Sequence, residues 1–326
     1  MKQNSKTETY DIEMDEDSDD IIELNSEEDG ERIDKYLSET LTDYSRSYLK
    51  NLIDEGRVQV AGKMVKSSFK VYNGAAITVN LPPIKDVKIL PEDIPLDILY
   101  EDEDVILVNK PKGMVVHPAA GHYTGTLVNA LMFHCKDNLS GINGVLRPGI
   151  VHRIDMDTTG VVIACKNDVA HRFIAEQLKE HSIKRKYQAI VYGSFKDDEG
   201  RIEGAIGRSK TDRKKMAIVP NGKPAITHYR VIKNYSSPNG NNFAHIECEL
   251  ETGRTHQIRV HKTSIGHPLL GDNVYGVAKN PFKLEGQTLH AEMLGFIHPR
   301  TKEYMEFHAP LPEYFTKLLI KLNNCF

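Results

Sequence analysis

Two uninterrupted apolar runs set the strongest constraint on how this 326-residue chain can fold. Residues 105–108 read V-I-L-V, and residues 161–165 read V-V-I-A-C. Successive side chains of a β-strand point to opposite faces of its sheet, so a strand without polar residues has no face suited to water. The two runs therefore predict buried strands.

Further strands and helices define the expected fold class. Strands are predicted at 187–192, 244–250 and 304–308, while 126–134 and 168–181 are predicted to be helical. Strands outnumber helices and turn residues are frequent, which favours an α+β fold with a mixed, mostly antiparallel sheet. Neither G-x-G-x-x-G nor G-x-x-x-x-G-K-[ST] occurs, so the nucleotide-cofactor folds lose their main support.

Chain length and prolines indicate separate domains. The length is that of about two domains. Pro82, Pro83 and Pro91 interrupt the chain, and proline both stiffens a connection and excludes a helix. The predicted organisation is an acidic tail at 1–28, a small αβ domain at 29–81, a linker at 82–94 and a larger sheet domain at 95–326.

Charge is distributed unevenly between the tail and the rest of the chain. The formal net charge is −4. Residues 1–28 hold 11 acidic and 2 basic residues, a net of −9, which leaves +5 for residues 29–326. We expect the tail to be disordered and solvated, because its acidic run opposes compaction. Two alternatives stay open: an edge strand at 21–24, and competition of the tail with a polyanion for the basic surface.

The sequence also bears on compartment and assembly. No run approaches the ~18 apolar residues of a membrane span, and the N-terminus lacks the apolar segment of a secretory signal. The four cysteines are far apart and form no C-x-x-C pair, so neither a disulfide framework nor a structural zinc site is expected. We expect a cytoplasmic monomer that does not bind a membrane.

Basic residues recur through the predicted first domain. Arg46, Lys50, Arg57 and Lys63 lie along a predicted helix, its end and the following turn. On charge alone this is an ordinary charged surface. However, the segments R-I-D-K-Y-L, S-R-S-Y-L-K-N-L-I, E-G-R-V-Q-V-A-G-K and N-G-A-A-I-T-V, in this order, resemble the S4 RNA-binding domain. The resemblance implies that these four side chains face structured RNA, which is bound mainly through phosphates.

The densest polar cluster precedes the second apolar run. Residues 149–160 read G-I-V-H-R-I-D-M-D-T-T-G, so two aspartates and Arg153 stand at the mouth of a buried sheet. Such a loop is costly for packing alone. One interpretation is that Asp155 or Asp157 only caps a turn, as aspartate often does. The other is that a carboxylate performs chemistry there.

A second polar cluster favours the chemical interpretation. In T-G-R-T-H-Q-I-R-V-H at 252–261, Gln257, Arg259 and His261 alternate with apolar residues, which predicts a strand with one polar face. Two arginines flanking an apolar site would hold an aspartate ionised, as a nucleophile or a base. Structural ion pairs are the alternative.

The histidines near this cluster raise the question of a metal. His256, His261 and His267 are close in sequence, but a third ligand type at compact spacing is missing. We expect hydrogen-bonded structural histidines and no metal site.

Several motifs, in order, resemble the RluA family of pseudouridine synthases. H-R-I-D-M-D-T-T-G at 152–160 matches the family's H-R-L-D-x-x-T-S-G, with Ile154 in place of Leu and Thr159 in place of Ser. Five other family motifs match N-K-P-K-G-M-V-V-H-P at 109–118, K-R-K-Y at 184–187, G-K-P-A-I-T-H-Y-R at 222–230, G-R-T-H-Q-I-R-V-H at 253–261 and G-H-P-L-L-G-D at 266–272. The resemblance implies an RNA enzyme that cuts the N1–C1′ bond of a uridine, rotates the uracil and rejoins it through C5. It implies no cofactor and no metal.

The resemblance also assigns roles to residues. It implies that Asp155 is the essential carboxylate, that Arg259 pairs with it, and that Tyr187 stacks on the base and is placed to move a proton at C5. Arg153 is expected to fill the space left by a uridine flipped out of structured RNA. The basic loop at 206–215 is interpreted as a phosphate contact. The expected RNA contacts of this domain are His152, Arg153, Arg208, Arg213, Lys214, Arg254, His256 and Gln257.

The substrate is less fixed by the sequence than the reaction. The resemblance favours 23S (large-subunit) ribosomal RNA, but members of the same fold family also modify transfer RNA. An RNA-binding ribosome-assembly factor would need only the basic patches and the S4-like unit, although the intact set of Asp155, Tyr187 and Arg259 disfavours a degenerate site. A hydrolytic nucleoside glycosylase would use similar carboxylate chemistry at C1′ and release free uracil.

Overall fold

The chain divides into two compact units in the computed structural model, Met1–Val87 and Lys88–Phe326. Within the described residues, no helix combines the length and the apolar character that a membrane crossing needs. The structure describes residues 20–41, 46–81, 89–118, 124–136, 138–142, 147–209, 212, 215–236, 242–277 and 280–325.

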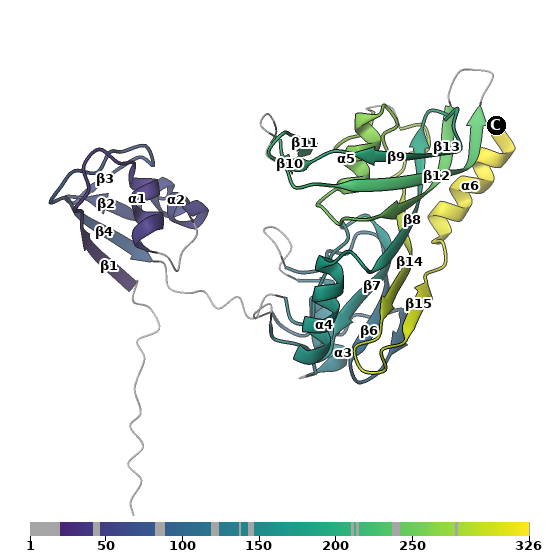
Figure 1. The fold of residues 1–326 in the computed structure, drawn as a ribbon, viewed down its shortest axis with the longest axis horizontal. Helices are drawn as coiled ribbons and strands as arrows, with labels where there is room; N and C mark the ends of the chain where they lie inside the picture. Colours follow the sequence, from purple (N-terminus) through teal and green to yellow (C-terminus); the bar gives the residue numbers. More distant parts are fainter. Residues whose placement is uncertain are drawn as a thin grey trace, which may run out of the picture. The chain divides into compact units, whose positions relative to one another are not determined.

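The first unit is a four-stranded antiparallel sheet packed against two short helices (Figure 1). Its elements are β1 (Asp20–Asn25), α1 (Ile33–Thr40), α2 (Arg46–Asp54), β2 (Val58–Val60), β3 (Lys63–Met64) and β4 (Ala76–Leu81). The sheet order is β1-β4-β2-β3. Leu37 of α1 and Leu49 of α2 share one apolar core with Val58 and Ile77 of the sheet. This core joins all the layers of the unit.

Strand β1 corrects the predicted boundary of the acidic tail. We expected a tail over 1–28, with an edge strand at 21–24 as the alternative, and Asp20–Asn25 pairs along its length with β4 at the edge of the sheet. Ile22 and Leu24 pack against the core, whereas Ile21 is exposed. The apolar alternation outweighs the local negative charge, because an edge strand can keep its charged side chains in solvent.

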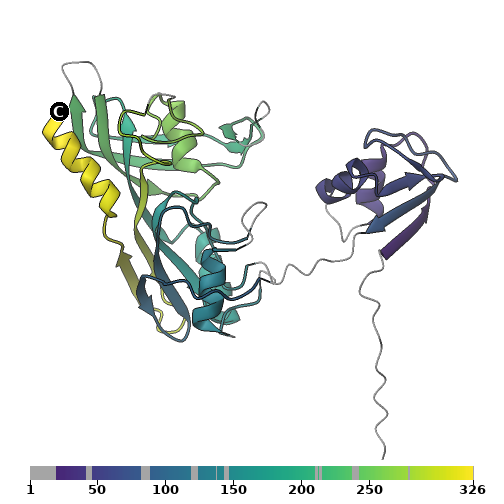
Figure 2. The ribbon, with the colours of Figure 1, turned by 180° about the vertical axis from the view of Figure 1, so that it is seen from behind.

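The second unit is built on one nine-stranded sheet (Figures 1 and 2). Its strands are β5 (Ile98–Glu101), β6 (Val105–Lys110), β7 (Thr159–Cys165), β8 (Lys184–Tyr192), β9 (Glu199–Glu203), β12 (Ile226–Ser236), β13 (Asn242–Leu250), β14 (Leu289–Ile297) and β15 (Tyr304–His308). The order is β5-β6-β7-β14-β8-β13-β12-β9, with β15 also paired to β14. Only β7 and β14 among these neighbours run parallel, which confirms the predicted mixed, mostly antiparallel α+β class.

Helices cover both faces of this sheet, as the two apolar runs require. Ile106 and Val162 point into the core that contains α3 (Leu127–Cys135), whereas Leu107 and Ile163 point into the core that contains α4 (Asp168–Lys179). The C-terminal helix α6 (Glu313–Cys325), yellow in Figures 1 and 2, packs against β8 and β13 in a further cluster. A short hairpin of β10 (Ile206–Arg208) and β11 (Met216–Ile218) and the helix α5 (Gln257–Ser264) complete the unit.

The parallel strands β7 and β14 approach closely at a glycine. Gly160 has a φ of +110°, and a Cβ at this position would lie 2.1 Å from the carbonyl oxygen of Ala291. Only glycine tolerates this contact without a shift of the strands. Next to it, Thr159 Oγ1 and His290 Nδ1 are 2.8 Å apart. These contacts fix the end of the loop that carries Asp155.

The prediction of a strand at 257–261 is wrong. These residues begin helix α5, which the chain enters through His256 with a φ of 57°. All residues from Gln257 to Lys262 are buried. A helix surrounded by protein has no solvent-facing stripe, so its polar and apolar residues do not repeat with the helical period.

Candidate active site

Asp155 lies in the loop before β7, with one carboxylate oxygen paired and the other open. Its Oδ2 accepts a hydrogen bond from Arg259 Nη1 at 2.9 Å. Its Oδ1 accepts no hydrogen bond from the described residues, and His256 Nε2 lies 3.8 Å away from it. The side chain is 18% exposed. One oxygen is therefore available to a bound molecule.

Arg259, in α5, is held between two carboxylates. Its Nε and Nη2 donate to Asp272 at 2.7 and 2.9 Å, and its Nη1 donates to Asp155. Burial would lower the pKa of Arg259, but the hydrogen bonds and charges of the two aspartates outweigh burial and raise it. Burial likewise opposes ionisation of Asp272, but Arg259 and two backbone N–H groups lower its pKa. Arg259 thus remains charged and oriented toward Asp155.

A tyrosine and a histidine support this pair. Tyr275 accepts a hydrogen bond from the Met216 N–H at 2.7 Å, and its hydroxyl lies 2.8 Å from His256 Nδ1. Its ring lies 5.0 Å from the guanidinium carbon of Arg259, within range of a cation–π interaction. Burial lowers the pKa of His256, although the charge of Asp155 opposes this. A neutral His256 therefore faces the open oxygen of Asp155.

Tyr187 lies on β8, between Cys248 of β13 and Ala291 of β14. The residue is 8% exposed, and its hydroxyl makes no hydrogen bond within the described part of the chain. Burial raises the pKa of Tyr187, so the phenol stays protonated at neutral pH. It can act as a proton donor or as a stacking surface for a flat ligand.

The predicted residues Asp155, Tyr187 and Arg259 line one cavity of about 60 Å³. Apolar walls come from Leu250 and Leu289. The arrangement combines a carboxylate with an open oxygen, a fixed counter-charge and an aromatic hydroxyl. Such a site can bind a flat, polar ring and stabilise positive charge that develops beside it.

A buried lysine that the sequence reasoning left without a role holds the Asp155 loop. Lys110, at the end of β6, is 1% exposed. Its Nζ donates to the carbonyl oxygens of Pro111 and Met114 at 2.8 Å and of Met156 at 3.0 Å. Burial lowers the pKa of Lys110 to about 7. The signal in the sequence was a lysine that directly follows an apolar strand, in N-K-P-K-G.

Two predicted RNA contacts form hydrogen bonds within the protein. Gln257 donates to Ile226 O and Thr227 Oγ1, and its Oε1 accepts from Thr252 and from the Arg254 N–H. Both donors and both acceptor sites of the amide are thus used within the protein, and an RNA contact by Gln257 stays a prediction. His152 Nε2 accepts a hydrogen bond from the Ile163 N–H, and burial lowers the pKa of His152 to about 4.

Three other predicted contacts also line the cavity. Arg153 is exposed, and its guanidinium has no ion pair or hydrogen bond with the residues that the structure describes. Arg254 donates from Nε to Pro224 O at 3.0 Å and has no carboxylate partner among those residues. His256 also lines the cavity. The two arginines leave positive charge at the rim of the site.

The remaining expected contacts lie elsewhere in each unit. In the first unit, Arg46 pairs with the buried Asp34 at 2.8 Å, yet its side chain is 53% exposed. Lys50 is half-buried, Arg57 lies 3.6 Å from Glu55, and Lys63 is exposed. In the second unit, Arg208 is exposed at the end of β10 and lines a cavity together with Arg254. Arg213 and Lys214 lie outside the described residues.

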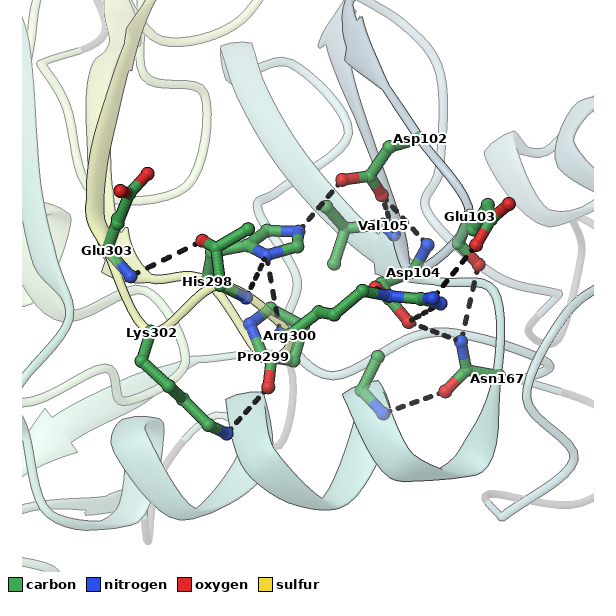
Figure 3. Close-up of polar contacts among 12 residues, drawn as sticks. Asp102, Glu103, Asp104, Val105, Asn167, His298, Pro299, Arg300, Lys302 and Glu303 are labelled. Carbon is green, nitrogen blue, oxygen red and sulfur yellow. Dashed lines mark hydrogen bonds and ion pairs between the residues drawn. The ribbon is translucent and has the colours of Figure 1, made fainter.

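One carboxylate–histidine cluster of the described residues has the spacing of a metal site. Several of its oxygen and nitrogen lone pairs already accept hydrogen bonds from the protein. Asp102, Asp104 and His298 bring their polar atoms within 4.8 Å of one another (Figure 3). However, Arg300 Nε donates to Asp104 at 2.6 Å, and His298 Nδ1 accepts N–H groups of residues 300 and 301. Arg300 already neutralises Asp104, so the cluster joins two turns of the sheet rather than fitting a cation.

Two family models match the chain. The model described as RNA pseudouridylate synthase matches residues 104–264, which include the cavity-lining Asp155, Tyr187 and Arg259. The model described as S4 domain matches residues 31–77, within the first unit. The S4 match agrees with the resemblance inferred from the sequence.

Relatives of similar length share much of the sequence. An RNA pseudouridine synthase of Bacillus subtilis, YlyB, is 50% identical over 303 residues, which cover 93% of this chain and 98% of that protein. Ribosomal large subunit pseudouridine synthase D of Zymomonas mobilis is 47% identical over 318 residues, with the same two coverages. The solved structure of human RNA Pseudouridylate Synthase Domain Containing 1 has a TM-score of 0.55 and 24% identity, covering 73% of this chain and 96% of that one. This last likeness concerns the fold.

Proposed function

Because the chain belongs to the RNA pseudouridylate synthase family and is therefore an isomerase acting on RNA, we propose that its substrate is a uridine of large-subunit (23S) ribosomal RNA and that Asp155 is its catalytic carboxylate. The open Oδ1 of Asp155, beside a cavity with Tyr187, is the observation that carries this proposal. Relatives named for the large ribosomal subunit support the choice of RNA. A ribosomal RNA substrate also implies action in the cytoplasm.

The reaction replaces the N1–C1′ bond of uridine by a C5–C1′ bond, while C5 loses a proton and N1 gains one. Cleavage of a glycosidic bond leaves C1′ electron-poor. The Oδ1 atom of Asp155 is the group placed to stabilise, trap or deprotonate this sugar. Arg259 holds Oδ2 of Asp155 by a hydrogen bond. The reacting Oδ1 therefore keeps its orientation when charge develops on the sugar.

Tyr187 and Arg153 complete the proposed base site. The Tyr187 ring provides a stacking surface for the uracil, and its protonated hydroxyl is placed to exchange a proton at C5. A uridine in structured RNA must leave its stack to enter the cavity, which costs about a few kcal/mol. Arg153, exposed and without an internal partner in the described residues, is suited to occupy the vacated position. The other predicted RNA contacts, in both units, remain proposals of the same kind.

Mapping of modified uridines tests the substrate. Pseudouridines of large-subunit ribosomal RNA and of transfer RNA are compared between cells with and without the gene. We expect that one or more sites are lost from the ribosomal RNA and none from transfer RNA. A loss confined to transfer RNA would contradict the proposed substrate.

Complementation separates the enzyme from an assembly factor. Asp155→Ala should bind the RNA as wild type does and restore no pseudouridine to the deletion strain. Normal turnover by this variant would refute the role of Asp155. Rescue of a ribosome-assembly defect by Asp155→Ala would instead favour a binding function that does not need catalysis.

A further inference from the structure

A second cavity, of about 320 Å³, adjoins the catalytic cavity. The two share Arg153, Tyr187, Leu250 and Arg254 as lining residues. The second cavity adds Arg185 and His181, and none of the described residues that line it is acidic. Three arginines without a carboxylate make this cavity a candidate site for an anion.

Arg185 is the buried member of this group. It lies on β8, two residues before Tyr187, and is 6% exposed. Its Nη2 donates to the carbonyl oxygen of Glu251 at 3.1 Å, whereas its Nε has no hydrogen-bond partner. Within the described residues, no carboxylate pairs with it. Arg259, by contrast, is buried to the same degree and contacts two carboxylates.

A buried guanidinium without a counter-charge opposes folding. Burial removes water from the charge, and the neighbouring Arg254 adds like-charge repulsion. Burial first, and Arg254 to a smaller extent, lower the pKa of Arg185. An anion in the cavity would supply both the missing charge and an acceptor for the free donors.

We propose that the second cavity binds a phosphodiester group of the RNA, next to the uridine that occupies the catalytic cavity, and that Arg185 is the buried anchor of this phosphate. The planar fork of arginine donors matches two phosphate oxygens. Because Tyr187 and Arg153 line both cavities, a base stacked on Tyr187 brings the adjoining backbone to Arg185. The inference rests on the proposed function, since it takes the RNA substrate as the ligand.

Salt dependence of RNA binding tests the phosphate contact without requiring turnover. A ribosomal RNA transcript containing the converted uridine is bound to wild type, Arg185→Met and Arg185→Lys over a range of salt concentrations. The slope of log affinity against log salt should fall in magnitude by about 0.7–1 in Arg185→Met and stay at the wild-type value in Arg185→Lys. The KM of Arg185→Met should rise about tenfold while kcat stays within about threefold of wild type.

Two controls separate binding from structure. Arg201→Gln, which removes an arginine paired with Glu203 on β9 and outside both cavities, should leave slope and KM unchanged. The thermal midpoint of Arg185→Met should equal or exceed that of wild type, because the substitution removes an unpaired buried charge. A wild-type salt slope and KM in Arg185→Met would overturn the inference.

A second measurement keeps the inference testable if Arg185→Met does not fold. Wild-type protein is titrated with transcripts in which the phosphate on either side of the uridine is a neutral methylphosphonate. One of the two substitutions should weaken binding about tenfold. Equal affinities for both modified transcripts and for the unmodified one would refute the phosphate site. Absence of pseudouridine formation by wild type, in contrast, would contradict only the proposed function.

Discussion

Two carboxylate networks stand at opposite ends of the catalytic sheet and differ in how many hydrogen bonds the central carboxylate accepts. Asp155 precedes β7, and Asp102 contacts the turn that follows β14, the strand parallel to β7 (Figure 3). Asp102 accepts hydrogen bonds from the N–H groups of residues 104 and 105 and from the Tyr100 hydroxyl, and His298 Nε2 lies 2.8 Å from its Oδ2. Asp155 receives one hydrogen bond, from Arg259, and borders a cavity.

The difference shows which feature of an ion-pair network indicates chemistry. Both networks are charged and partly buried, so neither burial nor pairing distinguishes them. A saturated carboxylate can only hold the fold together, whereas a carboxylate with an open oxygen beside a cavity can meet a substrate. We therefore expect substitutions at Asp155 to change activity and matched substitutions at Asp102 to change stability.

The largest expected effect is on turnover. Asp155→Asn should reduce kcat by at least about 10³-fold, because the amide cannot replace a carboxylate at C1′. Asp102→Asn, the matched substitution at the other network, should keep kcat near the wild-type value. The measurement is release of tritium from RNA labelled at C5 of uridine. Equal losses in the two variants would remove the distinction between the networks.

A smaller loss is expected from the residue behind Arg259. Asp272→Asn should lower kcat about 100-fold, because Arg259 loses the partner that orients it toward Asp155. The same change removes one of the two counter-charges of the buried Arg259 and should lower the free energy of unfolding by about 3 kcal/mol. Steady-state kinetics and denaturant unfolding measure the two effects. A stability loss with unchanged kcat would show that Asp272 only supports the fold.

At the saturated network the expected effect is on stability alone. Asp102→Asn should lower the free energy of unfolding by about 1–2 kcal/mol, since the amide cannot accept all three of the hydrogen bonds that the carboxylate accepts. Denaturant unfolding of the purified variant checks this. A wild-type unfolding curve would mean that the network contributes no net stability.

The smallest effect is a pH dependence of that stability. Burial would raise the pKa of Asp102, but the N–H groups of residues 105 and 104 and the Tyr100 hydroxyl outweigh it and lower the pKa below the ordinary value of 3.8. The stabilisation by the ionised Asp102 carboxylate is fully present above pH 3.8 and is lost as the pH falls through the lowered pKa of Asp102. The stability difference between wild type and Asp102→Asn should therefore shrink below about pH 4. A difference that stays constant to pH 2 would contradict the account.

The strands were predictable from the sequence because their burial has a simple cause. The runs at 105–108 and 161–165 have no polar face, and β6 and β7 are buried between helices on both sides. Helix α5 was not predictable in this way, because every side chain from Gln257 to Lys262 is buried and no helical stripe exists. Its polar residues depend on partners that are distant in sequence.

The sequence motifs indicate the site residues but not the contacts that support them. Asp155, Tyr187 and Arg259 stand in motifs, and the structure brings them to one cavity. Lys110 and Asp272 also stand in matched motifs, but their contacts with backbone carbonyls and with Arg259 appear only in three dimensions. Gln257 stands in a motif as well, and its amide is used within the fold. A polar residue in a motif can therefore be held by hydrogen bonds within the fold.

The fate of the uridine tests the central claim most directly. A substrate RNA with uniformly labelled uridine is incubated with excess enzyme, digested to nucleosides and analysed for uridine, pseudouridine and free uracil. With wild type, each uridine lost should appear as one pseudouridine, with no uracil, and Asp155→Asn should change none of the three. Free uracil from wild type, or pseudouridine from Asp155→Asn at the wild-type rate, would contradict the account.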